Sequence, residues 1–277
     1  MKKKNEINIL SDKCKTKYPL LMVHGIFFRD WKNFNYWGRI PAALESNGAT
    51  IFYGNHESCT TVENSAQELA ARIQEIIETT GCEKVNIIAH SKGGLDCKCA
   101  ISELGMAPYV ASLTTVNTPF TGSKFASHVL STMSIRKQKF LSGLYKFFFR
   151  FAGDKNPDLL HAVYDLTVER CTEFQKRFKP EPNIFYQGTG SVLNNPKGGR
   201  FPLIFNYKHV EKYDGPNDRL VGKDAFEWGE NFKFVTVSGK RGVAHGDMID
   251  LYREDIPGFD VKQFYTDIVS DLKNRGL

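Results

Sequence analysis

The chain of 277 residues has the length of one large α/β domain, and its 41% hydrophobic and 25% charged residues exclude a disordered polymer. No stretch approaches the roughly 18 consecutive apolar residues of a membrane-spanning helix, so no transmembrane segment is expected. The net charge of +6 permits attraction to an anionic surface without requiring it. Because no basic stripe interleaved with aromatics lies outside residues 121–160, nucleic-acid binding is not expected.

The N-terminal segment, residues 1–17, is charged and lacks the apolar run of a signal peptide. This predicts a cytoplasmic protein, or a secreted one whose export signal is absent from this sequence. Six cysteines in a chain of this length predict reduced thiols rather than a disulfide framework. Cys97 and Cys99 form a C-x-C pair without further ligands nearby, so we expect them to be small packing residues.

The first 120 residues alternate between apolar strands and amphipathic helices. The predicted strands, each apolar along its length, cover 18–25, 49–54, 84–90 and 110–119. The predicted helices between them cover 37–48, 62–80 and 93–104. Apolar strands separated by helices form βαβ units, so we expect a mostly parallel sheet with helices on both faces.

The pattern changes after Pro119. Residues 121–160 contain no convincing core strand but include an aromatic run with Lys139, Lys146 and Arg150 interleaved. Five apolar side chains recur there at helical spacing: Phe140, Leu144, Phe147, Phe148 and Phe151. This spacing predicts a helix with an apolar face.

The remainder of the chain completes the sheet pattern. One long helix is predicted over 159–178, strands over 183–188 and 233–239, and a last helix over 260–274. The stretch 189–232 is rich in Gly, Pro and Asn and is predicted to be mostly loop. Because no repeat or linker interrupts the pattern, residues 1–277 are predicted to form a single domain with 121–160 as an insertion.

The string AHSKG at residues 89–93 places a serine where a predicted strand turns into a predicted helix. A nucleophile on such a sharp turn needs small residues two positions before and after it, here Ala89 and Gly93. Ser91 is therefore the candidate nucleophile, although such short strings also arise by chance. Its hydroxyl would need a base to accept the proton.

Two backbone N–H groups usually stabilise the oxyanion that forms when a serine attacks a carbonyl. The amide of Lys92 is one candidate, because it follows Ser91 at a helix N-terminus. The amide of Ile26 is the other, since Gly25 lets the loop after the first strand turn its next amide toward the site. His24 is expected to brace this loop. The Lys92 side chain, next to the nucleophile, suggests a preference for anionic substrates.

Four histidines follow Ser91 in the chain. His245 is the preferred base, because it lies between the last predicted strand and the last predicted helix. The other three, His128, His161 and His209, lack this placement and are expected to be surface or packing residues.

Three aspartates compete to be the carboxylate that orients the base: Asp214, Asp218 and Asp224. Asp218 is preferred, since it lies in a turn-forming string followed directly by Leu-Val, which suits a carboxylate held beside the sheet. Asp214 is the alternative.

Seven ordered segments between about residues 18 and 260 resemble the bacterial triacylglycerol lipases related to those of Pseudomonas, Burkholderia and Proteus. They are YPLLMVHGI, YWGRIPAAL, KVNIIAHSKGG, VNTPFTGS, LTVERCTEFQKRF, NDRLVG and AHGDMIDL. The resemblance implies an α/β-hydrolase fold and a triad of Ser91, Asp218 and His245. It also implies oxyanion donors at the amides of Ile26 and Lys92, and a lid formed by the insertion over the active site.

Two departures from the family concern the region around the acid and the base. Arg219 replaces the glycine of the family's N-D-G-L-V turn, which leaves the backbone course there open. Members often hold a structural calcium through a carboxylate just after the catalytic histidine, here Asp247, and another upstream of the acid. Because residues 182–210 contain no Asp or Glu, we expect neither a metal nor a cofactor.

The leading hypothesis is a serine hydrolase that cleaves carboxylic esters through an acyl-serine, with acylglycerols at a lipid–water interface as substrates. A short-chain carboxylesterase, a thioesterase or an acyltransferase on the same scaffold is the alternative. A non-catalytic lipid-binding scaffold is a third hypothesis, which the presence of all three triad residues disfavours. For the aromatic run, the alternative to a lid is a core helix.

Overall fold

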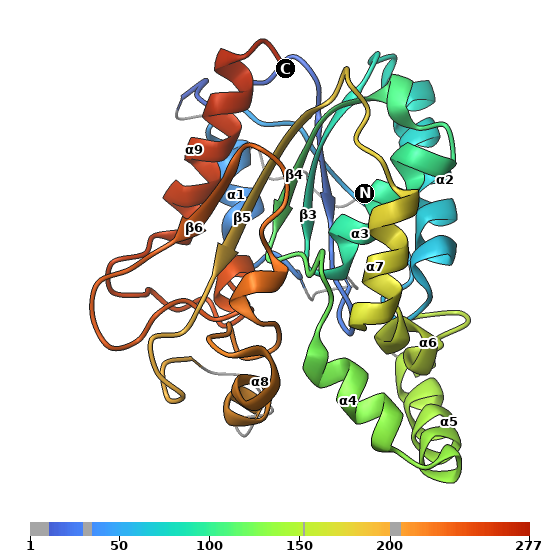
Figure 1. Ribbon diagram of the computed structural model, residues 1–277. Helices are drawn as coiled ribbons and strands as arrows, with labels where there is room; N and C mark the ends of the chain where they lie inside the picture. The colour runs from blue at the N-terminus through green and yellow to red at the C-terminus, as the bar shows by residue number, and fades with distance from the viewer. Residues whose placement is uncertain (1–10, 30–34, 152, 200–205) are drawn as a thin grey trace.

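Six parallel strands form one sheet in the computed structural model, which describes residues 11–29, 35–151, 153–199 and 206–277 (Figure 1). The strand order is β2-β1-β3-β4-β5-β6. The strands are β1 (Leu20–Val23), β2 (Ile51–Tyr53), β3 (Val85–His90), β4 (Val110–Val116), β5 (Phe185–Ser191) and β6 (Phe232–Val235). The parallel sheet expected from the sequence is confirmed. None of the described helices is long and apolar enough to cross a membrane.

Helices cover both faces of the sheet, so each face has its own core (Figure 1). Side chains alternate along β1, with Leu21 and Val23 in the core beneath α2, α3 and α7, and Leu20 and Met22 in the core beneath α1 and α9. The bounds of these helices are α1 (Ile40–Ser46), α2 (Val62–Thr80), α3 (Lys92–Glu103), α7 (Val168–Arg177) and α9 (Val261–Asn274). Burial on both faces explains why the strands are apolar throughout.

The carboxyl ends of β1, β3 and β4 meet at one edge of the sheet. Val23 is in register with Ala89, and His90 with Val116. Ligand sites of open α/β sheets lie at this edge. The remaining helices lie beyond it (Figure 1): α4 (Lys124–Thr132), α5 (Ile135–Phe151), α6 (Leu159–Tyr164) and α8 (Asn206–Asp214).

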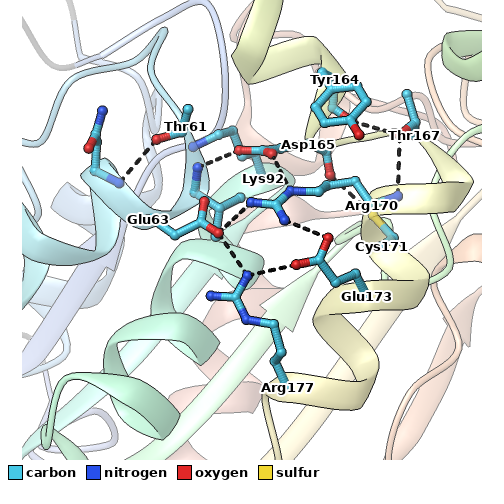
Figure 2. Close-up of polar contacts among 12 residues, drawn as sticks. Thr61, Glu63, Lys92, Tyr164, Asp165, Thr167, Arg170, Cys171, Glu173 and Arg177 are labelled. Carbon is cyan, nitrogen blue, oxygen red and sulfur yellow. Dashed lines mark hydrogen bonds and ion pairs between the residues drawn. The ribbon is translucent and has the colours of Figure 1, made fainter.

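The single helix predicted over 159–178 is wrong, because the chain forms two helices, α6 and α7, separated at Asp165–Thr167. The buried Asp165 carboxylate accepts hydrogen bonds from the Val62 amide at the start of α2 (2.7 Å) and from Arg170 Nε (3.0 Å). The Thr167 hydroxyl then caps α7, accepting from the Arg170 amide (Figure 2). These polar contacts hold the chain in a turn that apolar periodicity alone does not reveal.

The prediction of a mostly irregular stretch over 189–232 missed helix α8. Its aromatic partners lie on α4, where Phe125 stacks on His209 and His128 stacks on Tyr213. Asp214, the last residue of α8, accepts hydrogen bonds from the amides that begin α4. Contacts with a distant segment therefore stabilise a helix whose own sequence predicts it weakly.

Helix α3, which begins directly after Ser91, carries two buried lysines, Lys92 and Lys98. In the described part of the chain Lys98 forms no ion pair, and its ammonium lies over the rings of Trp228 (4.3 Å) and Phe120 (5.3 Å). Burial lowers the pKa of Lys98 to about 8. Attraction to two aromatic faces compensates only part of the cost of burying this charge.

Lys98→Met is expected to raise the free energy of unfolding near pH 7 by about 1–2 kcal/mol, since it removes a buried charge and keeps most of the apolar contact. The loss of stability caused by the buried Lys98 charge is full below the folded-state pKa of about 8. It disappears as pH rises toward the ordinary lysine pKa of ~10.4. Urea unfolding of both proteins near neutral and alkaline pH checks this. A stability difference that stays constant between the two conditions would contradict it.

Candidate active site

Ser91 occupies the sharp turn between β3 and α3. Its φ of 55° and ψ of −131° lie outside the regions that L-residues prefer, and its amide donates to the Val116 carbonyl at 2.9 Å. A Cβ on Gly93 would collide with the backbone of His24, and one on Gly94 with the Thr118 side chain. The small residues after the serine therefore let α3 start against the loops that follow β1 and β4.

The loop after β1 lies directly against the serine. A Cβ added to Gly25 would lie 2.7 Å from the Ser91 Cβ, so only glycine permits this approach. In the tautomer with its proton on Nδ1, His24 donates to the Gly25 carbonyl at 2.9 Å, while its Nε2 lies 3.1 Å from the His56 carbonyl. Because a trans peptide directs its C=O and N–H in opposite directions, this bond turns the Ile26 N–H away from His24. The contacts agree with the expected role of His24 as a brace.

The same loop is held on its other side by an aromatic hydroxyl. The Gly25 amide donates to the Tyr36 hydroxyl at 3.0 Å, and that hydroxyl lies 2.7 Å from His90 Nδ1. His24 also stacks on His56, with ring centroids 3.9 Å apart. Burial lowers the pKa of the His24, His56 and His90 imidazoles, so all three are uncharged at neutral pH. Their contacts hold the loop in place.

The expectation that the Lys92 side chain favours anionic substrates is wrong. Its ammonium is buried and donates to Asp96 Oδ1 at 2.7 Å and to Ser65 Oγ at 3.0 Å. Burial raises the pKa of Asp96 to about 6, while the neighbouring ammonium opposes that rise. The Lys92 ammonium therefore points into the protein interior and cannot contact a substrate. Only the backbone amide of Lys92 can take part in the site.

His245 and Asp218 form a buried pair beside the serine turn. His245 Nδ1 donates to Asp218 Oδ2 at 2.5 Å, and the His245 amide donates to the Asp218 carbonyl at 2.9 Å. The His245 ring lies 4.4 Å from that of His90, which directly precedes Ser91. The side chains of Ser91 and His245 are almost fully covered, with 4% and 6% of each residue exposed.

The Asp218 carboxylate is the most thoroughly bonded acid of the three candidates. Besides His245, it accepts from the amides of Leu220 (2.9 Å) and Val221 (2.8 Å) and from Asn117 Nδ2 (2.7 Å). These bonds fix both carboxylate oxygens, so the side chain has one orientation relative to the imidazole. The turn at residues 217–222 therefore positions a carboxylate oxygen as the acceptor at His245 Nδ1.

The rival residues are engaged elsewhere. Asp214 accepts hydrogen bonds from Ser123 Oγ and from the amides of Lys124 and Phe125, at the start of α4. Asp224 is exposed. The structure thus brings Ser91, Asp218 and His245 to one edge of the sheet and leaves Asp214 at a helix start.

Asn117 is a site residue that the sequence reasoning did not single out. It follows β4 in a left-handed conformation (φ 49°) and donates to both Asp218 Oδ2 and Ser191 Oγ. A polar residue directly after a central strand, next to the serine strand, was the available signal. Arg219 likewise adopts a positive φ, 92°, the conformation in which a glycine costs nothing.

Among the described side chains of helix α5, Phe149 packs near the loop after β1 and others lie in solvent. Phe149 is buried against Phe27, in the loop after β1, with ring centroids 6.3 Å apart. Phe140, Leu144 and Phe147 are 71%, 56% and 78% exposed. The side chains of Phe148 and Phe151 lie outside the described residues. The apolar residues of α5 therefore divide between an inner and an outer face.

Asp247, which the resemblance relates to calcium, is not available as a ligand. Arg241 Nη1 donates to Asp247 Oδ2 at 2.7 Å and Arg241 Nη2 to Asp247 Oδ1 at 3.1 Å, while the Ala244 amide also donates to Oδ2 at 2.7 Å. Among the residues that the structure describes, no group of three or more His, Cys, Asp or Glu could hold a metal ion. The residues present do not fit a calcium ion, which prefers several oxygen ligands.

Comparison with known proteins finds triacylglycerol lipases among the relatives of the chain. No family model matches the chain. Over 208 residues it is 30% identical to a triacylglycerol lipase of Pseudarthrobacter phenanthrenivorans and 30% identical to one of Burkholderia plantarii. Both matches cover 69% of this chain, but they span 64% and 57% of those lipases, less than two thirds of their length.

Solved structures give the same fold. The mature lipase of Bacillus licheniformis superposes with a TM-score of 0.62 at 22% identity, covering 87% of this chain and 89% of that chain. A metagenomic carboxyl esterase superposes with a TM-score of 0.68 at 14% identity, covering 94% and 76%. The chain has the α/β-hydrolase fold and is similar in sequence to bacterial triacylglycerol lipases.

Proposed function

We propose that the protein is a serine hydrolase of carboxylic esters, with acylglycerols as its substrates. The observation that carries the proposal is the buried Asp218–His245 pair, 2.5 Å between Oδ2 and Nδ1, at the sheet edge where Ser91 stands on its strained turn. A bonded carboxylate holds the imidazole with its proton on Nδ1, which leaves Nε2 as the acceptor that a serine hydroxyl requires.

The reaction follows from these roles. Ser91 Oγ attacks the ester carbonyl as His245 Nε2 takes its proton, and the Ile26 and Lys92 amides stabilise the oxyanion. His245 then gives the proton to the departing alcohol, leaving an acyl-serine. Water attacks this ester with the same base and releases the fatty acid. Asp218, which Asn117 holds in place, stabilises the imidazolium that forms in each half-reaction.

Helix α5 supports a lipid surface as the place where the substrate is met. Residues 135–151 contain five basic and no acidic residues. The exposed Phe140, Leu144 and Phe147 are spaced four and three residues apart, so they share one helical face. An apolar face flanked by lysine and arginine suits the boundary of a lipid layer. We infer that the insertion is a lid whose inner contact is Phe149 on Phe27.

The function is tested with p-nitrophenyl esters of increasing chain length and with a fluorophosphonate that labels activated serines. Wild type should hydrolyse the esters and become labelled once, whereas Ser91→Ala should lose roughly 10⁴-fold or more in kcat and take up no label. An inactive, unlabelled wild type would instead support a non-catalytic scaffold. Retention of most activity by Ser91→Ala would contradict the mechanism.

Phe140→Ser/Phe147→Ser is expected to reduce hydrolysis of emulsified triacylglycerol about 10-fold and to leave hydrolysis of a dissolved short-chain ester unchanged. The reason is that both side chains are exposed and so support binding to lipid rather than chemistry. Titration of the released acid on the two substrates measures the ratio. Equal loss on both substrates would argue against the lid, and preference for dissolved short esters in wild type would favour a carboxylesterase.

A further inference from the structure

One ion pair, between Arg241 and Asp247, bridges the turn that carries His245, and we call this pair the strap. Arg241 precedes the histidine by four residues and Asp247 follows it by two, and their side chains form the two-point contact described above. Arg241 Nη1 also donates to the Gly242 carbonyl at 3.1 Å. The strap therefore joins the segment that enters the turn to the segment that leaves it.

The carboxylate transmits this contact to the backbone on either side of the histidine. Asp247 Oδ2 accepts from the Ala244 amide at 2.7 Å, and the Asp247 amide donates to the Ala244 carbonyl at 3.0 Å. These bonds close the turn around His245, whose own amide is bonded to Asp218. Asp247 is 6% exposed, so solvent screens its pairing with the guanidinium only weakly.

The charges around Asp247 disfavour a divalent cation. Arg219, buried in the acid turn, interacts electrostatically with both Asp247 and Arg241, and its Nε and Nη1 have no hydrogen-bond partner in the described structure. Asp247 thus pairs with the Arg241 guanidinium and also lies in the electrostatic field of Arg219. A calcium ion at Asp247 would have to displace Arg241 and approach Arg219, and no group of three or more His, Cys, Asp or Glu among the described residues could hold it.

We propose that Arg241 is a positioning residue for the catalytic base, holding His245 through Asp247 at the place where the resemblance implies a calcium ion. The inference rests on the proposed hydrolase function. A bidentate guanidinium fixes the carboxylate in direction as well as in distance, which a single ammonium does not. The turn then keeps its shape without a metal, and the enzyme is independent of calcium.

The positioning role is tested by Arg241→Met with Arg241→Lys as the conservative partner. Arg241→Met should lower kcat roughly 10- to 100-fold with KM unchanged, because a displaced base affects the chemical step more than binding. Arg241→Lys should restore part of kcat, since lysine still reaches one carboxylate oxygen. The matched control is Arg275→Met, which breaks the remote Arg275–Asp271 pair on α9 and should leave kcat unchanged.

Asp247→Asn should resemble Arg241→Met, and the double variant should lose little more than either single one, because both remove the same contact. Wild-type kcat in Arg241→Met would overturn the proposal, as would a lysine variant no better than the methionine variant. Circular dichroism ensures that the compared variants are folded.

Calcium provides a test that needs no variant. The melting temperature and kcat of wild type should not change in excess EDTA or on later addition of calcium chloride. A fall in EDTA that calcium reverses would overturn the proposal. The melting readout does not require ester hydrolysis, so an inactive wild type whose melting ignores EDTA would refute the proposed function while the metal-free strap stands.

Discussion

Replacement of Asp218 by asparagine is expected to lower kcat by roughly 10³- to 10⁴-fold while KM changes little. Asp218 Oδ2 accepts from His245 Nδ1, whereas an amide NH₂ at that place would donate. The imidazole would then carry its proton on Nε2, facing the serine, and could not act as the base. Steady-state kinetics on a p-nitrophenyl ester measure the loss.

Asp214→Asn is the matched control, because it makes the same chemical change four residues earlier. Asp214 bonds the amides that begin α4 rather than an imidazole. We expect it to cost about 1 kcal/mol of stability, typical of a weakened helix cap, and to retain kcat. If Asp214→Asn were crippled while Asp218→Asn remained active, the assignment of the acid would have to change.

The proposed triad could be assembled from the sequence because each of its members has a local signature. Ser91 stands where a β-branched strand meets a glycine pair, and His245 lies between the last strand and the last helix. Asp218 was chosen over Asp214 from its turn-forming neighbours, and the structure places it against His245. Chain order and turn chemistry are properties of a few adjacent residues, so a sequence alone can express them.

The errors lie where distant segments decide the local structure. The break between α6 and α7 depends on a bond from Asp165 to the Val62 amide, 103 residues away. Helix α8 is stabilised by rings on α4, and Asn117 becomes a site residue only through its contact with Asp218, 101 residues away. Periodicity reports how a segment meets solvent and core, and it contains no information on such partners.

The side chain of Lys92 shows a second limit, since its ion-pair partner is only four residues away in the chain. Its position next to Ser91 suggested a charge facing the substrate, yet the start of a helix can direct a side chain inward as readily as outward. The ammonium is paired with Asp96, one helical turn along α3. A charge at an active-site position in the sequence is thus evidence about substrates only after its partner is known.

Gly25→Ala is expected to lower kcat by roughly 10²-fold or more, with a much smaller effect on stability. The added methyl would lie 2.7 Å from the Ser91 Cβ and 3.1 Å from the His90 carbonyl, so the loop after β1 would have to move away from the serine. That movement would carry the Ile26 amide with it and remove one of the two proposed oxyanion donors. Because His245 and Asp218 remain in place, the Ser91 hydroxyl would still be activated. The oxyanion of the transition state, however, would lose one hydrogen-bond donor.

Gly81→Ala separates this effect from the general cost of replacing a glycine. Gly81 caps α2 at φ 71°, and nothing lies within 4 Å of an added Cβ. We expect it to lose about 1 kcal/mol of stability through left-handed strain and to keep kcat. For Gly25→Ala, slower labelling by fluorophosphonate and weaker binding of a boronic acid, which mimics the tetrahedral intermediate, should accompany the fall in kcat. If Gly25→Ala lost ester hydrolysis but bound the boronic acid as tightly as wild type, the loop would act by positioning the substrate. It would then not act by positioning an oxyanion donor.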